Sequence, residues 1–265
     1  MNKKQVDVVV CTKDRPENLI SCVEMIAKLI PYDTLYVLEG SLKPNYIVLD
    51  YLVSNFGVKM VYVPYLKFGA VRNLVMRICK TDYVAMIDDD ITLAFDWYDK
   101  LMEEFKDDSV MAAGSRLILD HPLISKLSLA NTRVSGGSGG ASIYDVKKVL
   151  SVGNFDKNIH RGEDMELELR IVASGQKWVK SNKTFALHPI TVREFLSRAK
   201  ANVVGWDFIM RESRHKTVFM IKRFGSTLVM PTYYFWKTFD LRCAGLWAIY
   251  KWQSLLYWLS GRYVR

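Results

Sequence analysis

Residues 83–90 read YVAMIDDD, an apolar run that ends in Asp88, Asp89 and Asp90. An apolar run of this length that stops at charged residues predicts a buried strand with an acidic cluster at its C-terminal end. Three adjacent carboxylates repel one another unless a positive group neutralises them. Mg²⁺ commonly binds one or two carboxylates together with substrate phosphates. The stretch therefore indicates a metal–diphosphate site, although an isolated acidic triplet is more often a solvated turn.

Strand and helix patterns alternate through the region before this stretch. Predicted strands cover 6–11, 35–38 and 58–63, and predicted helices cover 17–29, 46–56 and 69–79. This alternation over the first 110 residues predicts an α/β fold with a mostly parallel sheet flanked by helices. Ligands of such sheets bind beyond the carboxyl ends of the strands, where the aspartates are expected.

The region after the aspartates continues with shorter elements. Predicted strands cover 110–119, 141–144, 178–180 and 185–188, and predicted helices cover 145–151 and 165–173. Between them, residues 135–140 read SGGSGG, which is typical of a flexible loop. The absence of side chains would also let this backbone approach a bound sugar or diphosphate.

The charge of the chain is concentrated at its C-terminal end. Residues 190–265 contain 13 Lys and Arg against 4 Asp and Glu, which accounts for the whole net charge of +9. They also contain five of the seven tryptophans. Basic residues with Trp and Tyr favour an anionic membrane surface. A nucleic acid, or an ordinary helical subdomain or oligomer interface, is the alternative explanation.

We place the domain boundary near residue 190, with a catalytic-type domain over 1–190 and a membrane-association segment over 191–265. Residues 241–259 approach the roughly 20 apolar residues of a spanning helix, but Arg242 and Lys251 interrupt them. We therefore expect helices that lie on the membrane, with Arg211, Arg214, Lys216, Lys222 and Arg223 at the headgroups. The N-terminus shows no signal-peptide pattern, and the four cysteines have no metal-site spacing. A peripheral location on the cytoplasmic side is expected.

Five features in sequence order resemble the family 2 glycosyltransferases, which have the GT-A fold. They are VDVVVCTKDRPENL at 6–19, the strand-end Glu39, GAVRN at 69–73, IDDD at 87–90 and GED at 162–164. Each feature alone is weak, but the ordered set is specific, and the resemblance covers roughly residues 5–190. It implies a GT-A domain that binds a sugar nucleotide.

The resemblance also implies roles for individual residues. The residues expected at the donor nucleotide and its phosphates are Thr12, Asp14, Arg15, Glu39, Arg72, Asn73, Asp88 and Asp89. Asp88 and Asp90, with His188 as a possible third ligand, would hold Mn²⁺ or Mg²⁺. Simpler explanations exist for several of them: turn and capping chemistry for the first loop, and a solvated position for Glu39, Arg72 or His188.

Asp164 is the expected catalytic base, with Glu163 beside it to orient it or raise its pKa. An inverting transfer needs a base that deprotonates the acceptor hydroxyl. A carboxylate at a helix N-terminus is favoured in its ionised form, which is the form a base needs. An acid-rich first helical turn without a catalytic role is the alternative.

The predicted function is an inverting, metal-dependent, non-processive hexosyltransferase that acts on a lipid-linked or membrane-proximal acceptor, with no nucleic-acid partner. Trp178 does not complete the Q-x-x-R-W pattern of processive synthases. A sugar-phosphate nucleotidyltransferase is one alternative, but it would need a glycine-rich loop where residues 12–16 read TKDRP. A non-catalytic protein that binds membrane or nucleic acid through its basic tail is the other.

Overall fold

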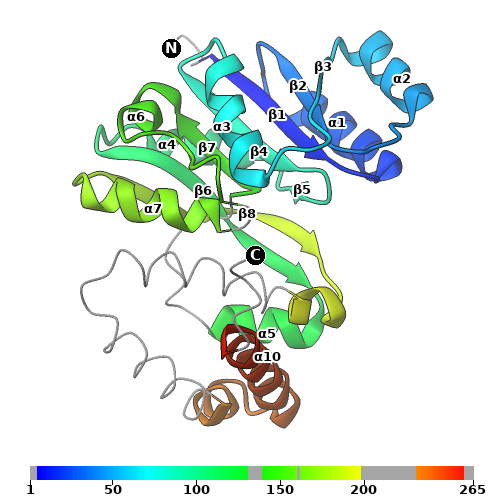
Figure 1. Cartoon of the computed structure of the whole chain (residues 1–265). Helices are drawn as coiled ribbons and strands as arrows, with labels where there is room; N and C mark the ends of the chain where they lie inside the picture. Colours follow the sequence, from blue (N-terminus) through cyan, green and yellow to red (C-terminus); the bar gives the residue numbers. More distant parts are fainter. Residues whose placement is uncertain (1–4, 131–138, 160–161, 198–230, 260–265) are drawn as a thin grey trace. The chain divides into compact units, whose positions relative to one another are not determined.

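The computed structural model describes residues 5–130, 139–159, 162–197 and 231–259. The chain divides into two compact units (Figure 1). The first unit comprises Met1–Leu117 and Ser135–His188, and the second comprises Ile118–Val134 and Pro189–Arg265. The predicted basic headgroup contacts at residues 211–223 and most of the SGGSGG loop lie outside the described residues.

The described strands form one eight-stranded sheet in the order β3-β2-β1-β4-β7-β6-β8-β5. Their bounds are β1 Val6–Thr12, β2 Leu35–Glu39, β3 Lys59–Tyr62, β4 Tyr83–Asp88, β5 Thr92–Leu93, β6 Val110–Asp120, β7 Ala141–Asp145 and β8 Lys177–Pro189. The predicted strand before the aspartates is β4, and its burial pattern confirms a buried strand with a partly exposed end.

The parallel half of the sheet brings three predicted site residues to one edge. β1 pairs in parallel with both β2 and β4, with Thr12 opposite Glu39 and Cys11 opposite Asp88. All three strands therefore end together, and the loops that follow them meet at this edge. This is the edge at which an open α/β sheet binds its ligands.

The other half of the sheet is antiparallel, so the sheet is mixed rather than mostly parallel. β7 runs antiparallel to β4, with Ala141 opposite Ile87, and β6 runs antiparallel to β7. β5 likewise pairs antiparallel with β8. Helical residues also separate most of these later strands, so an alternation of strands and helices does not by itself fix a parallel direction. Because β7 runs antiparallel to β4, it begins at the edge where β4 ends.

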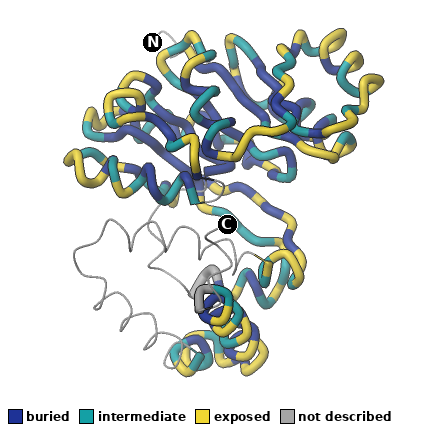
Figure 2. Tube along the Cα trace, viewed as in Figure 1, coloured by how far each residue is buried: buried dark blue, intermediate teal, exposed yellow. Residues whose placement is uncertain are grey.

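Helices cover both faces of the sheet in the first unit (Figure 1). They are α1 Pro16–Leu29, α2 Tyr46–Phe56, α3 Phe68–Ile78, α4 Trp97–Glu104, α6 Val146–Ser151 and α7 Glu163–Ala173. Alternate residues of β1 enter different apolar clusters: Val8 and Val10 pack with residues of α1 and α4, whereas Val9 packs with residues of α3, α6 and α7. The buried strands at the centre of Figure 2 reflect this two-sided burial.

The second unit has its own apolar cluster. It contains α5 Pro122–Ala130, α10 Leu241–Leu259 and helical residues 192–197 and 231–238. Ile124 and Leu127 of α5 are buried against Tyr234, Cys243 and Leu246. This packing explains why Ile118–Val134 groups with the second unit, although the sequence placed it in the first domain. No helix among the described residues is long and apolar enough to span a membrane.

Candidate active site

The three aspartates at the end of β4 lie near two different arginines, Arg15 and Arg72. Arg15, in the turn after β1, places Nη1 3.0 Å from Asp89 Oδ1 and 2.6 Å from Asp90 Oδ2. The hydroxyl of Thr12 donates a hydrogen bond of 2.6 Å to Asp89 Oδ2. The predicted residues of the first loop therefore do lie against the predicted metal-binding motif.

Asp88 faces the other arginine, Arg72 of α3. Arg72 Nη2 lies 3.9 Å from Asp88 Oδ1, and Arg72 Nη1 lies 3.2 Å from Glu163 Oε1. The side chain of Arg72 is only 5% exposed. Its guanidinium carbon also lies 5.5 Å from the centre of the Phe68 ring and 5.9 Å from that of Phe155. The site thus contains a buried cation enclosed by aromatic rings and carboxylates.

The rest of the GAVRN element fastens the segment that leads to α7. Asn73 Nδ2 donates 2.6 Å to the carbonyl of Phe155, and Asn154 Nδ2 donates 3.1 Å to the carbonyl of Asn73. A Cβ on Gly69 would overlap the carbonyl oxygen of Asp156. Asn73, predicted at the donor, therefore has its side-chain amide bound to the chain's own backbone, where it helps to position α7.

Glu163 and Asp164 occupy the first turn of α7, which begins two residues earlier than predicted. Gly162 precedes them with a φ of 84°, a left-handed conformation that suits glycine. Asp164 Oδ1 accepts a hydrogen bond of 2.8 Å from the backbone N–H of Met165. Helix α7 therefore presents both carboxyl groups beside Arg72.

Two glycines just before β7 complete this group and were missed as individual site residues. A Cβ built on Gly140 would overlap the carboxylate of Asp88, and one on Gly139 would overlap the guanidinium of Arg72 and lie 2.9 Å from Asp164 Oδ2. The carbonyl of Gly140 accepts a hydrogen bond of 2.8 Å from the Asp88 N–H. The glycine-rich sequence SGGSGG did indicate a close approach of the backbone to another group. That group was expected to be a ligand, whereas in the structure it is the chain's own charged side chains.

Burial and mutual repulsion raise the pKa values of three acidic groups in this region. Burial raises the pKa of Asp88, and Arg72 opposes the shift only in part. Burial also raises the pKa of Asp89. The pKa of Glu163 is raised by burial as well, against the attraction of Arg72. The group carries more negative charge than its arginines balance, so it favours an added cation.

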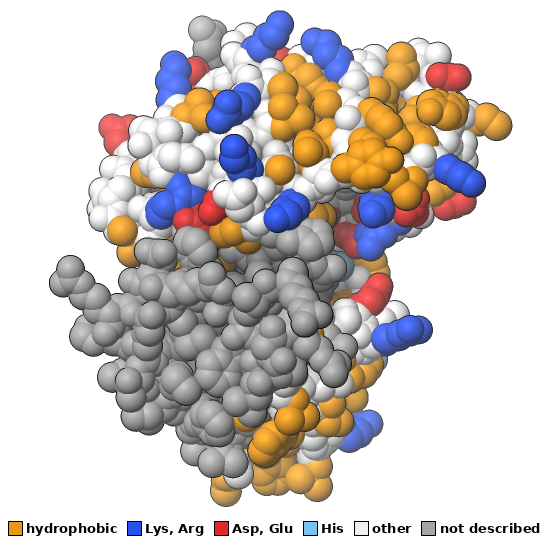
Figure 3. All heavy atoms as spheres, in the orientation of Figure 1, with side chains coloured by type: hydrophobic (Ala, Val, Ile, Leu, Met, Phe, Trp, Pro, Cys, Tyr) orange, Lys and Arg blue, Asp and Glu red, His pale blue; other side chains and the backbone are white. Residues whose placement is uncertain are grey.

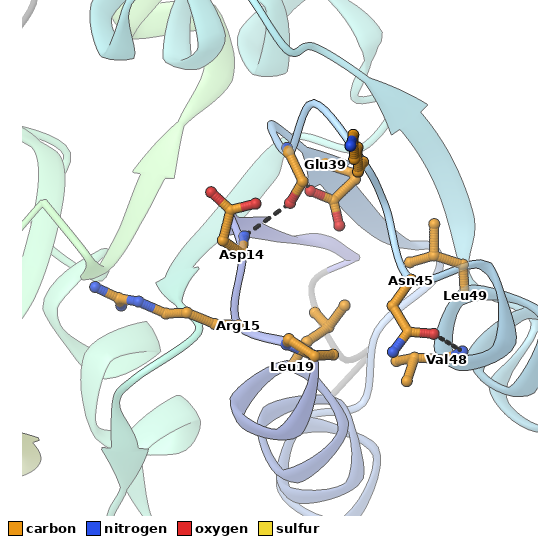
Figure 4. A pocket seen from close by; sticks show the side chains of 10 residues that line it. Asp14, Arg15, Leu19, Glu39, Asn45, Val48 and Leu49 are labelled. Carbon is orange, nitrogen blue, oxygen red and sulfur yellow. Dashed lines mark hydrogen bonds between the residues drawn. The ribbon is translucent and has the colours of Figure 1, made fainter.

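A cleft opens beside the triplet, between the first turns of α1 and α2 (Figure 4). Its polar lining includes Asp14 and Glu39, both expected at the donor nucleotide, and also Ser41 and Asn45, which the sequence did not single out. Glu39 is buried, and its Oε1 accepts 2.6 Å from the Ser41 N–H. In Figure 4 the side chain of Arg15 extends away from this cleft. The cleft offers hydrogen-bonding groups and an apolar wall from Leu19, Val48 and Leu49.

His188, the expected third metal ligand, is buried at the end of β8. Its Nε2 lies 3.9 Å from Asp90 Oδ1. Among the described residues, no three His, Cys, Asp or Glu side chains form a ready-made metal cluster. A cation at this edge would therefore need further ligands besides the side chains that the described residues bring together.

Comparisons with known proteins bear on the family and on the fold. Residues 7–121 match the family described as Glycosyl transferase family 2. Over these residues the chain is similar to a family 2 glycosyltransferase domain. It is also similar to the pre-mycofactocin glycosyltransferase of two Mycobacterium tuberculosis strains, with 26% identity over 147 residues. That match covers 48% of this chain and 31% of the relative, so the chain spans about a third of the length of these curated relatives.

Solved structures show that the chain has a GT-A-like fold. The mannosyltransferase PcManGT from Pyrobaculum calidifontis, solved with GDP-Man and Mn²⁺, aligns with a TM-score of 0.75 at 13% identity, over 98% of this chain and 89% of that chain. GalNAc-T7, solved with UDP, GalNAc and Mn²⁺, aligns with a TM-score of 0.58 at 15% identity, over 70% and 43%. At these identities the similarity establishes the fold and not the substrate.

Proposed function

We propose that the chain is a metal-dependent, inverting glycosyltransferase that moves a hexose from a nucleoside diphosphate to an acceptor at a membrane. The observation that carries this proposal is the convergence of Asp88, Arg72, Glu163 and Asp164 at the edge of the sheet beside the cleft. Three separate segments of the sequence contribute these side chains, and Arg72 and Glu163 are buried. Such a concentration of charge in a partly buried site is typical of a catalytic site.

The donor nucleotide would enter the cleft between α1 and α2. Glu39 and Asp14 offer acceptors for base or ribose donors, and Asn45 offers its Nδ2, since its Oδ1 already accepts from Val48 N. Thr12, Arg15 and Asp89 lie at the adjacent edge, toward the expected position of the diphosphate. The neighbours solved with GDP-Man and with UDP support a nucleotide in this class of fold.

The acidic group fits a divalent cation such as Mn²⁺ or Mg²⁺. Asp88 and Asp90 would hold it, with His188 nearby, and the diphosphate would supply further oxygen ligands. When bound, such a cation neutralises the charge that develops on the leaving diphosphate. Both solved neighbours contain Mn²⁺, which supports a metal in this role.

Asp164 would act as the general base. Its carboxylate would take the proton of the acceptor hydroxyl as that oxygen bonds to the anomeric carbon of the sugar. The bond from the anomeric carbon to the diphosphate oxygen breaks in the same step, and its electron pair leaves with the diphosphate. Arg72 would stabilise the added negative charge from its buried position. A single displacement of this kind inverts the anomeric centre.

The acceptor would be lipid-linked or close to a membrane, on its cytoplasmic side. The positive charge and the tryptophans of residues 190–265 support this location. The incomplete processive pattern at Trp178 supports a single transfer rather than chain synthesis.

The decisive experiment measures sugar transfer or hydrolysis from a panel of sugar nucleotides, with Mn²⁺, Mg²⁺ or a chelator. We expect Asp164→Asn to lower kcat by roughly 10²–10⁴-fold, the range of general-base catalysis, while nucleotide binding is retained. The matched control is Asp99→Asn, at an exposed acid of α4, which should leave kcat unchanged. Metal-dependent turnover at the wild-type rate in Asp164→Asn would remove Asp164 as the base.

A thermal-shift series identifies the donor base. A ligand that binds only the folded state raises the unfolding midpoint. We expect one nucleoside diphosphate to raise it in the presence of Mn²⁺ and to lose this effect in Asp88→Asn. Equal stabilisation by every nucleotide without metal would contradict the proposed donor site.

A further inference from the structure

Helix α10 has an exposed face that is apolar along its length. Residues spaced by three or four positions share one face of a helix. On α10 these are Leu241 (74% exposed), Gly245, Ile249 (50%), Trp252 (48%) and Leu256 (60%), which we call the α10 stripe. On the other side of the helix, Cys243 and Leu246 are buried in the core of the second unit. A surface helix ordinarily exposes a polar face.

The stripe continues across the corner at which helical residues 231–238 meet α10. Trp236 is 68% exposed and Phe239 is 76% exposed. Phe239 has a φ of 49°, a left-handed conformation that is uncommon for a bulky residue. Figure 3 shows hydrophobic side chains along the lower edge of the molecule, over these two helices. The apolar surface is therefore formed by two elements and not by one helix alone.

Asp240 fixes the geometry of this corner. Its Oδ2 lies 3.2 Å from Lys126 Nζ of α5 and 3.0 Å from Arg242 Nη2, and its Oδ1 accepts 3.0 Å from the Arg242 N–H. The carboxylate is therefore occupied by its own cations and is mostly buried. Trp236 and Phe239 are therefore exposed at a corner whose geometry is fixed by these contacts. The one acidic side chain of residues 231–257 is buried there.

The charge around the stripe selects between its possible occupants. Lys237 and Arg242 are exposed beside it, and residues 190–265 carry a net charge of +9. Two copies of this segment would repel each other, whereas anionic headgroups would attract it. Trp residues at the edge of an apolar strip, with Lys and Arg alongside, are characteristic of helices that lie in the membrane interface.

We propose that the α10 stripe, together with Trp236 and Phe239, is the surface through which the second unit lies on an anionic lipid bilayer. This inference deepens the membrane-proximal function proposed above and rests on it. The stripe would enter the boundary between headgroups and acyl chains, with the axis of α10 parallel to the membrane plane. Lys237, which is exposed beside Trp236, would meet the lipid phosphates.

The test is flotation of the full chain with vesicles of phosphatidylcholine, alone or mixed with phosphatidylglycerol. We expect the wild type to bind the anionic vesicles. For Ile249→Glu we expect the bound-to-free ratio to fall about tenfold or more, because the substitution places a negative charge in the α10 stripe, where it is repelled by the anionic lipid and excluded from the acyl chains. Ile47→Glu is the matched control, since Ile47 is an 84% exposed isoleucine on α2 of the first unit. It should bind as the wild type does.

A second variant, Leu241→Ser, guards against misfolding of Ile249→Glu and should also weaken binding. Failure of the wild type to float, or equal binding by wild type and both stripe variants, overturns the proposal. So does a dimer in light scattering that Ile249→Glu dissociates, because the stripe would then be covered by a second copy. Stabilisation by a nucleoside diphosphate with Mn²⁺ is measured on the same samples. It reports the proposed catalytic function independently of vesicle binding.

Discussion

Arg72 and Arg15 neutralise the same acidic triplet from two different environments. Arg72 is 5% exposed and lies between Asp88 and Glu163, whereas Arg15 is 47% exposed and bridges Asp89 and Asp90. A buried charge that loses its partner is strongly destabilising, but an exposed pair contributes little. The comparison teaches that Arg72 is part of the folded structure of the site. Arg15, in contrast, can release its carboxylates to an incoming cation and bind a phosphate instead.

Arg72→Met should give the largest effect of any change at this site. It leaves Glu163 and Asp88 without their buried cation, which we expect to lower the free energy of unfolding by about 3–5 kcal/mol. Urea denaturation measures this loss. An unfolding free energy within about 1 kcal/mol of wild type would show that Arg72 contributes no more to stability than Arg15 does.

Gly140→Ala should have the next largest effect. A Cβ at this position would overlap the Asp88 carboxylate, and overpacking of this kind costs roughly 1–3 kcal/mol. The metal-dependent stabilisation by nucleotide should be lost with it, because Asp88 must move. Gly245→Ala is the matched control: nothing lies within 4 Å of its Cβ position, so the better helix former should be neutral or slightly stabilising.

Asp88→Asn should stabilise the protein without metal while it abolishes the response to metal. Burial raises the pKa of Asp88, so the folded state binds its proton more tightly than the unfolded state does. The contribution of Asp88 to stability is therefore lost as the pH rises from the unfolded value of about 4 through the raised folded value. The stability of Asp88→Asn relative to wild type should consequently be greater at neutral than at acid pH. Thermal unfolding from acid to neutral pH measures this difference, and a constant difference would contradict it.

Arg15→Met should change stability least, by less than about 1 kcal/mol, because its ion pairs are partly solvated. Its effect should appear instead in the dependence of nucleotide binding on Mn²⁺, since Asp89 and Asp90 lose the cation that covers them. Titration of Mn²⁺ at fixed nucleotide measures this. An unchanged titration would mean that Arg15 and the metal do not compete for Asp90.

The parallel half of the fold could be predicted because its chemistry is local. Buried runs such as YVAMI, a proline at the start of α1 and the glycine after α2 mark elements by their own residues. The antiparallel half could not be predicted, because β7 joins β4 through pairing that no local pattern encodes. Helix α5 was missed for a similar reason, since its apolar residues are buried by α10, more than a hundred positions away.

The candidate site likewise has a part that could be predicted and a part that could not. The charged residues could be selected from the sequence by their type, and the structure brings Asp88, Arg72, Glu163 and Asp164 together. Other contacts became clear only from the geometry. Asn73 is a residue type that often binds ligands, but here its side-chain amide donates a hydrogen bond to the backbone carbonyl of Phe155. Gly139 and Gly140 have no side-chain chemistry, so only their neighbours in space could show why nothing larger fits.

The reversed direction of β7 has a consequence for how such a protein can diversify. Because Ala141 lies opposite Ile87, the register of β7 against β4 itself brings Gly140 against Asp88. Sequence changes that keep this register should therefore keep the contact between Gly140 and Asp88. A shift of the register by one residue would exchange the two faces of β7 and break that contact.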